Sequence, residues 1–127
     1  MIFTSCYQNL GELRELGWRE EDLVGISRGK FFGIKNNCES LQPSSELLSR
    51  YLWAKRNYGG LWLDDVKIEF ERKFKKYLMS LDVNYWGKVL DGKVLLCWEK
   101  SGEFCHRNFV RQWLNYYGYN CIELWCK

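Results

Sequence analysis

One short segment near the end of the chain gathers most of the side chains that could do chemistry. Residues 97 to 107 include two cysteines, two glutamates, an arginine and the only histidine of the chain. An apolar run that predicts a buried strand precedes this segment, and an amphipathic pattern that predicts a helix follows it. In open α/β sheets, ligands bind in the crevice at the carboxyl ends of the strands. The sequence therefore predicts a functional site at this strand-to-helix connection.

Four residues of the segment are candidates for catalysis: Glu99, Cys97, Cys105 and His106. A carboxylate can act as general acid or base when its pKa is raised. Cys105 is predicted near a helix N-terminus and beside a potential imidazolium, both of which lower a thiol pKa, so Cys105 and Cys97 are candidate nucleophiles. Each residue also has a structural explanation, because free cysteines are often buried hydrophobes and an inward histidine is often a hydrogen-bonded core residue.

The next residue, Arg107, indicates that this segment has an anionic partner. The helix is predicted to begin near Gly102 or Glu103, and its first N–H groups attract anions because they lack intrahelical partners. A cation in the first turn opposes the helix dipole, so its partner is expected to be Glu99, Glu103 or a ligand phosphate. We expect Arg107 to pair with Glu99 and to lower the pKa of that carboxyl. Glu99→Gln is then expected to cost about 1–3 kcal/mol.

A zinc site would use Cys97, Cys105 and His106, with Cys6 or Glu99 as the fourth ligand. The usual C-x-x-C and H-x-x-x-H spacings are absent, and adjacent residues on a helix point in different directions, so we predict no metal. The chain also lacks G-x-G-x-x-G and G-K-[ST] motifs, which disfavours a Rossmann cofactor and a nucleoside triphosphatase. We predict no cofactor.

Hydrophobic periodicity predicts the elements that position these residues. Apolar runs predict strands at 2–5, 23–26, 94–98 and 121–124, and helical spacing predicts helices at 10–16, about 45–57, about 64–81 and about 103–117. The stretch 29–45 is predicted to be a long loop. Apolar strands that alternate with helices imply a parallel sheet with right-handed crossovers. We predict a three-layer Rossmann-like α/β sandwich around a small, mostly parallel sheet, as a single domain over residues 1–127.

The simplest sheet order places strand 2–5 beside strand 94–98, with the other two strands outside. Thr4, Ser5 and Cys6 then lie opposite Cys97, Trp98 and Glu99, with Ser27 and Arg28 alongside. In this arrangement Arg28, Arg107 and the N-terminus of the last helix would hold an anion, and Trp98 or a tyrosine of the middle segment would stack on a base. The predicted core comprises Ile2, Phe3, Val24, Ile26, Leu95, Leu96, Phe109, Val110, Trp113 and Ile122.

Three segments carry a family resemblance. LLCWEKSGEFCHRNFVRQWL closely resembles the C-terminal signature of the domain-of-unknown-function 488 family, a strand with Cys-x-Glu-Lys followed by Cys-His-Arg and a helix. IFTSCYQN and VGISRGK resemble its first two strands, and the likeness is thinner between about 35 and 90. The resemblance implies the same fold and a site at Thr4, Ser5, Ser27, Arg28, Cys97, Glu99, Lys100, Cys105, His106 and Arg107. Many members have Asp-Val-Arg where this chain has Ile26-Ser27-Arg28, so any role of that aspartate is absent or moved.

Composition limits the partners. The 127 residues are 46% hydrophobic and 17% aromatic, and the formal net charge of +3 is too small to indicate nucleic acid by itself. No run reaches the length of a membrane span, the N-terminus lacks a secretory pattern, and no C-x-x-C pair occurs. We therefore expect a cytoplasmic protein with reduced thiols and no membrane partner.

Taken together, these features predict a protein that binds a nucleotide-like or phosphorylated small molecule at the carboxyl ends of its strands, as a hydrolase or transferase. One alternative is a non-catalytic module that binds or sequesters such a ligand. Another alternative is a nucleic-acid-binding protein that uses the basic face of the helix at 67–76. Because Glu69 and Glu71 are interspersed with the lysines of that face, we favour an ordinary solvated helix surface there.

Overall fold

The computed structural model describes residues 1–57 and 60–127, with only the backbone of Leu61. It contains a five-stranded, all-parallel sheet in the order β3-β2-β4-β1-β5. The strands are β1 (Ile2–Cys6), β2 (Leu23–Gly25), β3 (Asn36–Asn37), β4 (Val94–Cys97) and β5 (Cys121–Glu123). The predicted α/β class and the predicted pairing of the first strand with the strand ending at Cys97 are both confirmed.

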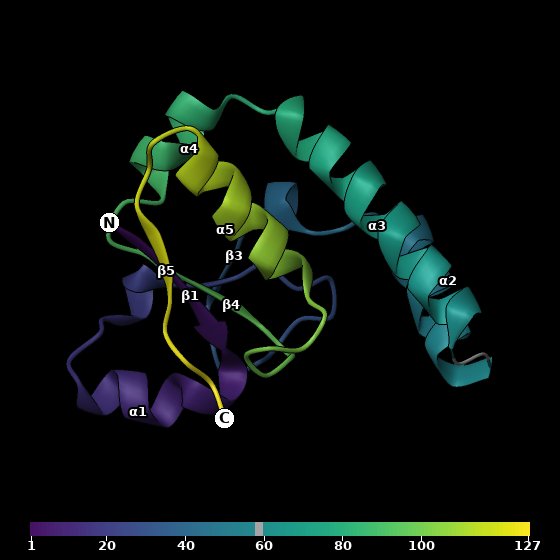
Figure 1. Cartoon of the computed structure of the whole chain (residues 1–127). Helices are drawn as coiled ribbons and strands as arrows, with labels where there is room; N and C mark the ends of the chain where they lie inside the picture. Colours follow the sequence, from purple (N-terminus) through teal and green to yellow (C-terminus); the bar gives the residue numbers. More distant parts are fainter. Residues whose placement is uncertain (58–59) are drawn as a thin grey trace.

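Five α-helices lie within the described residues. They are α1 (Leu10–Glu15), α2 (Ser45–Asn57), α3 (Leu61–Met79), α4 (Val83–Val89) and α5 (His106–Tyr116), with short 3-10 turns at Tyr7–Asn9, Glu20–Asp22 and Glu39–Leu41. Helix α1 lies on one face of the sheet and α5 on the other, while α2 packs against α3 at one side of the molecule (Figure 1). Side chains of β4 alternate between the two faces. Val94 and Leu96 pack with Leu13 of α1, whereas Leu95 packs with residues of α3 and α5. The result is the predicted three-layer arrangement.

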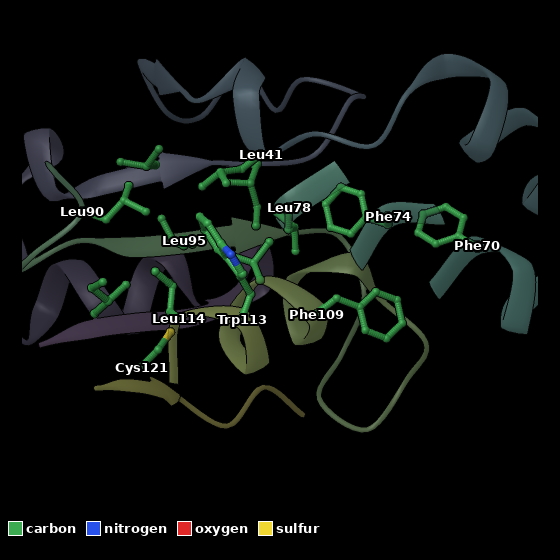
Figure 2. Close-up of a cluster of buried hydrophobic side chains, with 14 of the residues drawn as sticks. Leu41, Phe70, Phe74, Leu78, Leu90, Leu95, Phe109, Trp113, Leu114 and Cys121 are labelled. Atoms are coloured by element: carbon green, nitrogen blue, oxygen red, sulfur yellow. The ribbon is translucent and has the colours of Figure 1, made fainter. Parts of the chain in front are cut away.

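The larger core lies between the sheet and helices α3 and α5 (Figure 2). The apolar stripe of α5 is buried against Leu95 and against the aromatic face of α3, as the 3.6-residue period predicts. The predicted core is largely confirmed. Phe3 is half-buried, and Ile122 is an error because it is 46% exposed on the edge strand, where Cys121 is buried instead.

Helix ends agree with the sequence at α2 and differ at α3 and α5. Ser44 caps α2, its Oγ accepting a hydrogen bond from the Leu47 N–H at 3.2 Å. Helix α3 begins at Leu61, earlier than the predicted Asp64, behind a Gly60 N-cap with φ of 62°. Helix α5 begins at His106, later than predicted, because Cys105 has an extended backbone.

Two elements lie where none was predicted. Within the predicted loop 29–45, the short strand β3 pairs with β2, Val24 opposite Asn36 and Gly25 opposite Asn37. Two asparagines carry no hydrophobic signal; main-chain pairing with β2 forms this edge, and the Asn36 side chain adds a hydrogen bond to the Glu20 carbonyl at 3.2 Å. Helix α4 follows Asp82, whose carboxylate caps its N-terminus. Among the described residues, no helix is long and apolar enough to cross a lipid bilayer.

The C-terminal tail returns to the carboxyl end of β1. The Leu124 N–H donates to the Thr4 carbonyl at 2.7 Å, and the Asn9 side chain donates to the Trp125 carbonyl at 2.9 Å. This return brings Cys126 to Cys6, and the two form a disulfide with Cα atoms 6.0 Å apart. The expectation of six reduced thiols is therefore wrong for this pair, because sequence spacing does not show which distant cysteines meet in the fold.

Candidate functional site

A tightly turned loop connects β4 to α5 and positions the predicted site. Its turn at Gly102 has a φ of 89°, which favours glycine. The Lys100 N–H donates to Glu103 Oε1 at 3.0 Å, and the Ser101 N–H donates to the Cys126 carbonyl at 2.9 Å. These bonds hold the loop and place Cys97 and Cys105 on either side of it.

The structure brings together Cys97, Cys105 and His106, which we call the thiol–imidazole group. Their ligand atoms all lie within 4.8 Å of one another, and Cys97 Sγ is 3.8 Å from His106 Nδ1. The expectation that Cys105 and His106 point apart is wrong, because Cys105 precedes the helix in an extended conformation. His106 Nε2 is 2.6 Å from the Ile26 carbonyl. A carbonyl only accepts, so Nε2 carries a proton; Nδ1 then presents a lone pair to the sulfurs in the neutral imidazole and an N–H in the imidazolium.

The pKa values of the two thiols are shifted in opposite directions. Burial raises the pKa of Cys105, but hydrogen bonds with Cys97 and His106 outweigh burial and lower it to about 6. Hydrogen bonding to Cys105, together with burial, raises the pKa of the Cys97 thiol well above its ordinary value. Arg107 Nη1 also donates to Cys105 Sγ at 3.4 Å. The group is thus able to hold one thiolate at neutral pH, as predicted for Cys105.

Arg107 is fully buried and pairs with Glu123 on β5, not with Glu99. Its Nη2 is 2.9 Å from Glu123 Oε2 and its Nε is 3.1 Å from Oε1. Thr4 and Ser101 hydroxyls donate to the same carboxylate, each at 2.6 Å. Burial raises the pKa of Glu123, but the bonds from Arg107, Ser101 and Thr4 outweigh it and hold the pKa below its usual value.

The predicted ion pair between Arg107 and Glu99 is therefore wrong. Arg107 Nη1 donates to the Glu99 main-chain carbonyl at 2.6 Å, while the Glu99 carboxylate accepts a hydrogen bond from Cys97 Sγ at 3.2 Å. The physical reason is register. Glu123 lies on the neighbour of β1 and faces the start of α5, a proximity that the local spacing of Glu99 and Arg107 does not show.

The predicted hydroxyl ligands Thr4, Ser5 and Ser27 are buried and bonded inside the protein. Ser5 Oγ donates to the Leu124 carbonyl at 2.9 Å. In the sheet Cys6 is the residue opposite Cys97, so Thr4 and Ser5 lie deeper than expected, opposite Leu95 and Leu96. None of these hydroxyls is open to a ligand in this conformation.

Residues 25–29 also match the G-x-S-x-G pattern of serine hydrolases, which places the serine on a turn between a strand and a helix. Here no helix follows Gly29 directly, and the chain continues to β3. Ser27 Oγ lies 2.6 Å from Tyr7 Oη and 2.6 Å from the Gly29 carbonyl. Because His106 is bonded to the Ile26 carbonyl, the serine has no histidine base.

The exposed members of the predicted site are Arg28, Trp98 and Lys100. The Trp98 indole N–H donates to the Gly29 carbonyl at 2.8 Å, and its ring packs edge-on against Tyr7 and Phe31. Trp98 therefore fixes the loop that carries Arg28. The hydrogen bond of Lys100 to Glu103 is made by its main-chain N–H, not by its side chain.

Arg28 opens onto a cleft of about 640 Å³, which we call the α2–α3 cleft. Arg50 of α2 and Lys73 of α3 also line it, together with the first turn of α2 and the aromatic residues Phe74 and Tyr77. Sequence reasoning missed Arg50 and Tyr77 and assigned Lys73 to a solvated face, because their convergence depends on how α2 packs against α3. Comparison with family models, with curated proteins and with solved structures finds no match to this chain.

Proposed function

We propose that this protein binds a nucleotide-like or phosphorylated small molecule in the α2–α3 cleft and holds its anionic group at Arg28. The observation that carries the proposal is the convergence of three cations, Arg28, Arg50 and Lys73, on one cleft at the carboxyl end of β2. Its volume lies in the range of about 300–1,000 Å³ typical of small-molecule sites.

The charges of the cleft single out Arg28. Glu69 pairs with both Arg50, at 3.1 Å, and Lys73, at 2.9 Å. No described residue pairs with Arg28. A guanidinium presents a planar fork of donors that suits a phosphate. Arg28 is therefore the cation with unused donors, while Arg50 and Lys73 add positive potential.

Two further features of the cleft suit such a ligand. The first turn of the 13-residue helix α2 lines one side, and its N–H groups favour an anion, although Glu46 in the same turn opposes one. Phe74 and Tyr77 line the cleft with aromatic rings, which suit stacking on a base. A smaller hollow of about 350 Å³ between α3 and α5 has Lys75 as its lone cation and is otherwise apolar or uncharged.

The geometry favours binding without turnover. Phe74 lies between the cleft and the thiol–imidazole group, packing edge-on against His106 with ring centroids 5.5 Å apart. Cys97, Cys105 and His106 are each at most 6% exposed. A ligand in the cleft therefore does not reach the thiols as they stand, and Glu99 is not among the residues that line the cleft, so the catalytic roles predicted for these four residues are not part of the proposal. The family resemblance would place the anion at the same edge of the sheet through Arg28.

Isothermal titration with AMP, ADP, ADP-ribose and inorganic phosphate tests the proposal. Wild type is expected to bind at least one of the phosphorylated compounds with one site per chain. Arg28→Ala should weaken that binding about 10-fold to 100-fold, since a hydrogen bond to a charged group contributes about 1.5–3 kcal/mol. Arg19→Ala is the matched control, because Arg19 is paired with Glu21 and Asp22 on another surface.

Absence of binding to every compound, or equal binding by Arg28→Ala and wild type, would overturn the proposal. Recovery of the ligand unchanged after long incubation, checked by mass spectrometry, is the expected result for a binding protein. Conversion of the ligand would instead favour a hydrolase or transferase. A salt-sensitive mobility shift with nucleic acid would favour a nucleic-acid-binding protein.

A further inference from the structure

A second candidate site lies behind Phe74, at the thiol–imidazole group. We propose that Cys97, Cys105 and His106 bind one Zn²⁺ ion, with the Glu99 carboxylate beside it. Two sulfurs and one imidazole nitrogen are a donor set typical of zinc sites in proteins. This proposal does not rest on the ligand of the α2–α3 cleft.

The distances are close to those that zinc requires. With Zn–S of about 2.3 Å and Zn–N of about 2.0 Å, tetrahedral sulfur and nitrogen ligands lie about 3.5 Å apart. Cys97 Sγ and His106 Nδ1 are 3.8 Å apart, and all three ligand atoms fall within 4.8 Å of one another. Cys97 Sγ and His106 Nδ1 therefore need to approach by only about 0.3 Å, and side-chain rotations that close the remaining separations by up to about 1.3 Å would complete the coordination by these three atoms.

The imidazole is already oriented for a metal. Histidines that ligate metals usually donate their second ring N–H to a carbonyl or carboxylate, which fixes the tautomer. His106 Nε2 does this with the Ile26 carbonyl at 2.6 Å, so in the neutral imidazole the Nδ1 lone pair is directed toward the sulfurs. An ordinary core histidine needs no such pair of thiols at its free nitrogen.

The surroundings also match the charges of a metal site. Two thiolates neutralise the ion, and Arg107 donates to Cys105 Sγ at 3.4 Å, as a positive neighbour of that thiolate. Glu99 Oε2 lies 3.2 Å from Cys97 Sγ, within reach of an ion held by that sulfur. Binding releases the protons of both thiols to solvent, and no oxidant or reductant is needed.

An entry path is present. Cys105 lines a hollow of about 490 Å³ together with Ser101, Gly102 and Asn108. This hollow is distinct from the α2–α3 cleft, because Phe74 separates that cleft from the thiol–imidazole group. A hydrated ion can therefore reach Cys105 without passing through the proposed ligand site.

Metal titration of the intact chain tests the proposal. Competition against a chromophoric chelator is expected to show one Zn²⁺ per chain. Co²⁺ in its place should give intense thiolate-to-metal charge-transfer absorption and the visible bands of tetrahedral cobalt. Cys97→Ser and His106→Gln should each weaken zinc binding at least about tenfold, whereas Cys38→Ser, at a half-buried free cysteine outside the group, should leave it unchanged.

Alkylation of wild type gives a readout that needs no variant to fold. At reaction times long enough for iodoacetamide to modify Cys97 and Cys105 of the zinc-free protein, zinc should protect both thiols and leave the alkylation of Cys38 unaffected, as mapped by mass spectrometry. The proposal fails if wild type takes up no zinc, if cobalt shows no thiolate charge transfer, if protection is missing, or if Cys38→Ser weakens binding as much as Cys97→Ser. No phosphorylated ligand is present, so this outcome is separate from that of the cleft experiments.

Discussion

Glu123→Gln removes the negative charge that compensates the fully buried guanidinium of Arg107. The carboxylate accepts two hydrogen bonds from Arg107 and one each from Thr4 and Ser101. A glutamine has one acceptor oxygen and an NH₂ group that only donates, so it cannot accept all four. Breaking a buried ion pair by removing one partner costs about 3–5 kcal/mol. Because the Glu123 side chain is 15% exposed, we expect the low end, about 3 kcal/mol.

Glu99→Gln is the matched control, since it makes the same chemical change at the carboxylate first expected to pair with Arg107. The Glu99 carboxylate accepts one weak hydrogen bond, from Cys97 Sγ, and the hydrogen bond from Arg107 to the Glu99 main-chain carbonyl survives the change. We expect a loss below about 1 kcal/mol. Urea unfolding followed by tryptophan fluorescence at pH 7 measures both variants. Equal losses, or a larger loss for Glu99→Gln, would refute the assignment of Glu123 as the charge partner.

Three further predictions follow from the packing and the charges. The pKa of Glu123 is lower in the folded than in the unfolded protein, so its stabilising effect is complete above the unfolded pKa and is lost as the pH falls through the folded pKa. The difference in unfolding free energy between wild type and Glu123→Gln should therefore shrink below about pH 4 in an acid titration. Gly87→Ala should cost about 1–3 kcal/mol in thermal melts because its Cβ overlaps the Tyr119 ring, whereas Gly11→Ala in α1 meets nothing and should be neutral or stabilising. Reduction of the Cys6–Cys126 disulfide, which spans 120 residues, should lower stability by about 2–4 kcal/mol, and an unchanged melting temperature after verified reduction would contradict its structural role.

The sequence predicted those parts of the fold that depend on hydrophobic periodicity. The runs at β1, β2 and β4 and the stripe of α5 bury one continuous core, so their type and order follow from apolar spacing. Strand β3 depends on main-chain pairing, which leaves little hydrophobic signal. Helix α4 is only seven residues long, and the helical spacing of Val83, Trp86 and Leu90, which pack on the core, is the signal that could have revealed it.

The residues of the candidate site were predictable from the sequence, but the contacts among them were not. Cys97, Cys105 and His106 stood out because they are close in sequence, and the structure brings them together. Their convergence depends on the extended backbone of Cys105, which the predicted earlier start of α5 concealed. The partners of Arg107 and Cys6 are Glu123 and Cys126, both brought in by the C-terminal strand and tail, and sequence distance gives no sign of either contact.

The central claim is that Arg28 holds the phosphate of a ligand in the α2–α3 cleft. A crystal structure of the protein with the tightest-binding compound of the titration panel tests this claim most directly. We predict density for the phosphate within hydrogen-bond distance of the Arg28 guanidinium, with the rest of the ligand extending toward Tyr77. Ligand density at any other place on the protein, with the α2–α3 cleft left unfilled at saturating concentration, would contradict it.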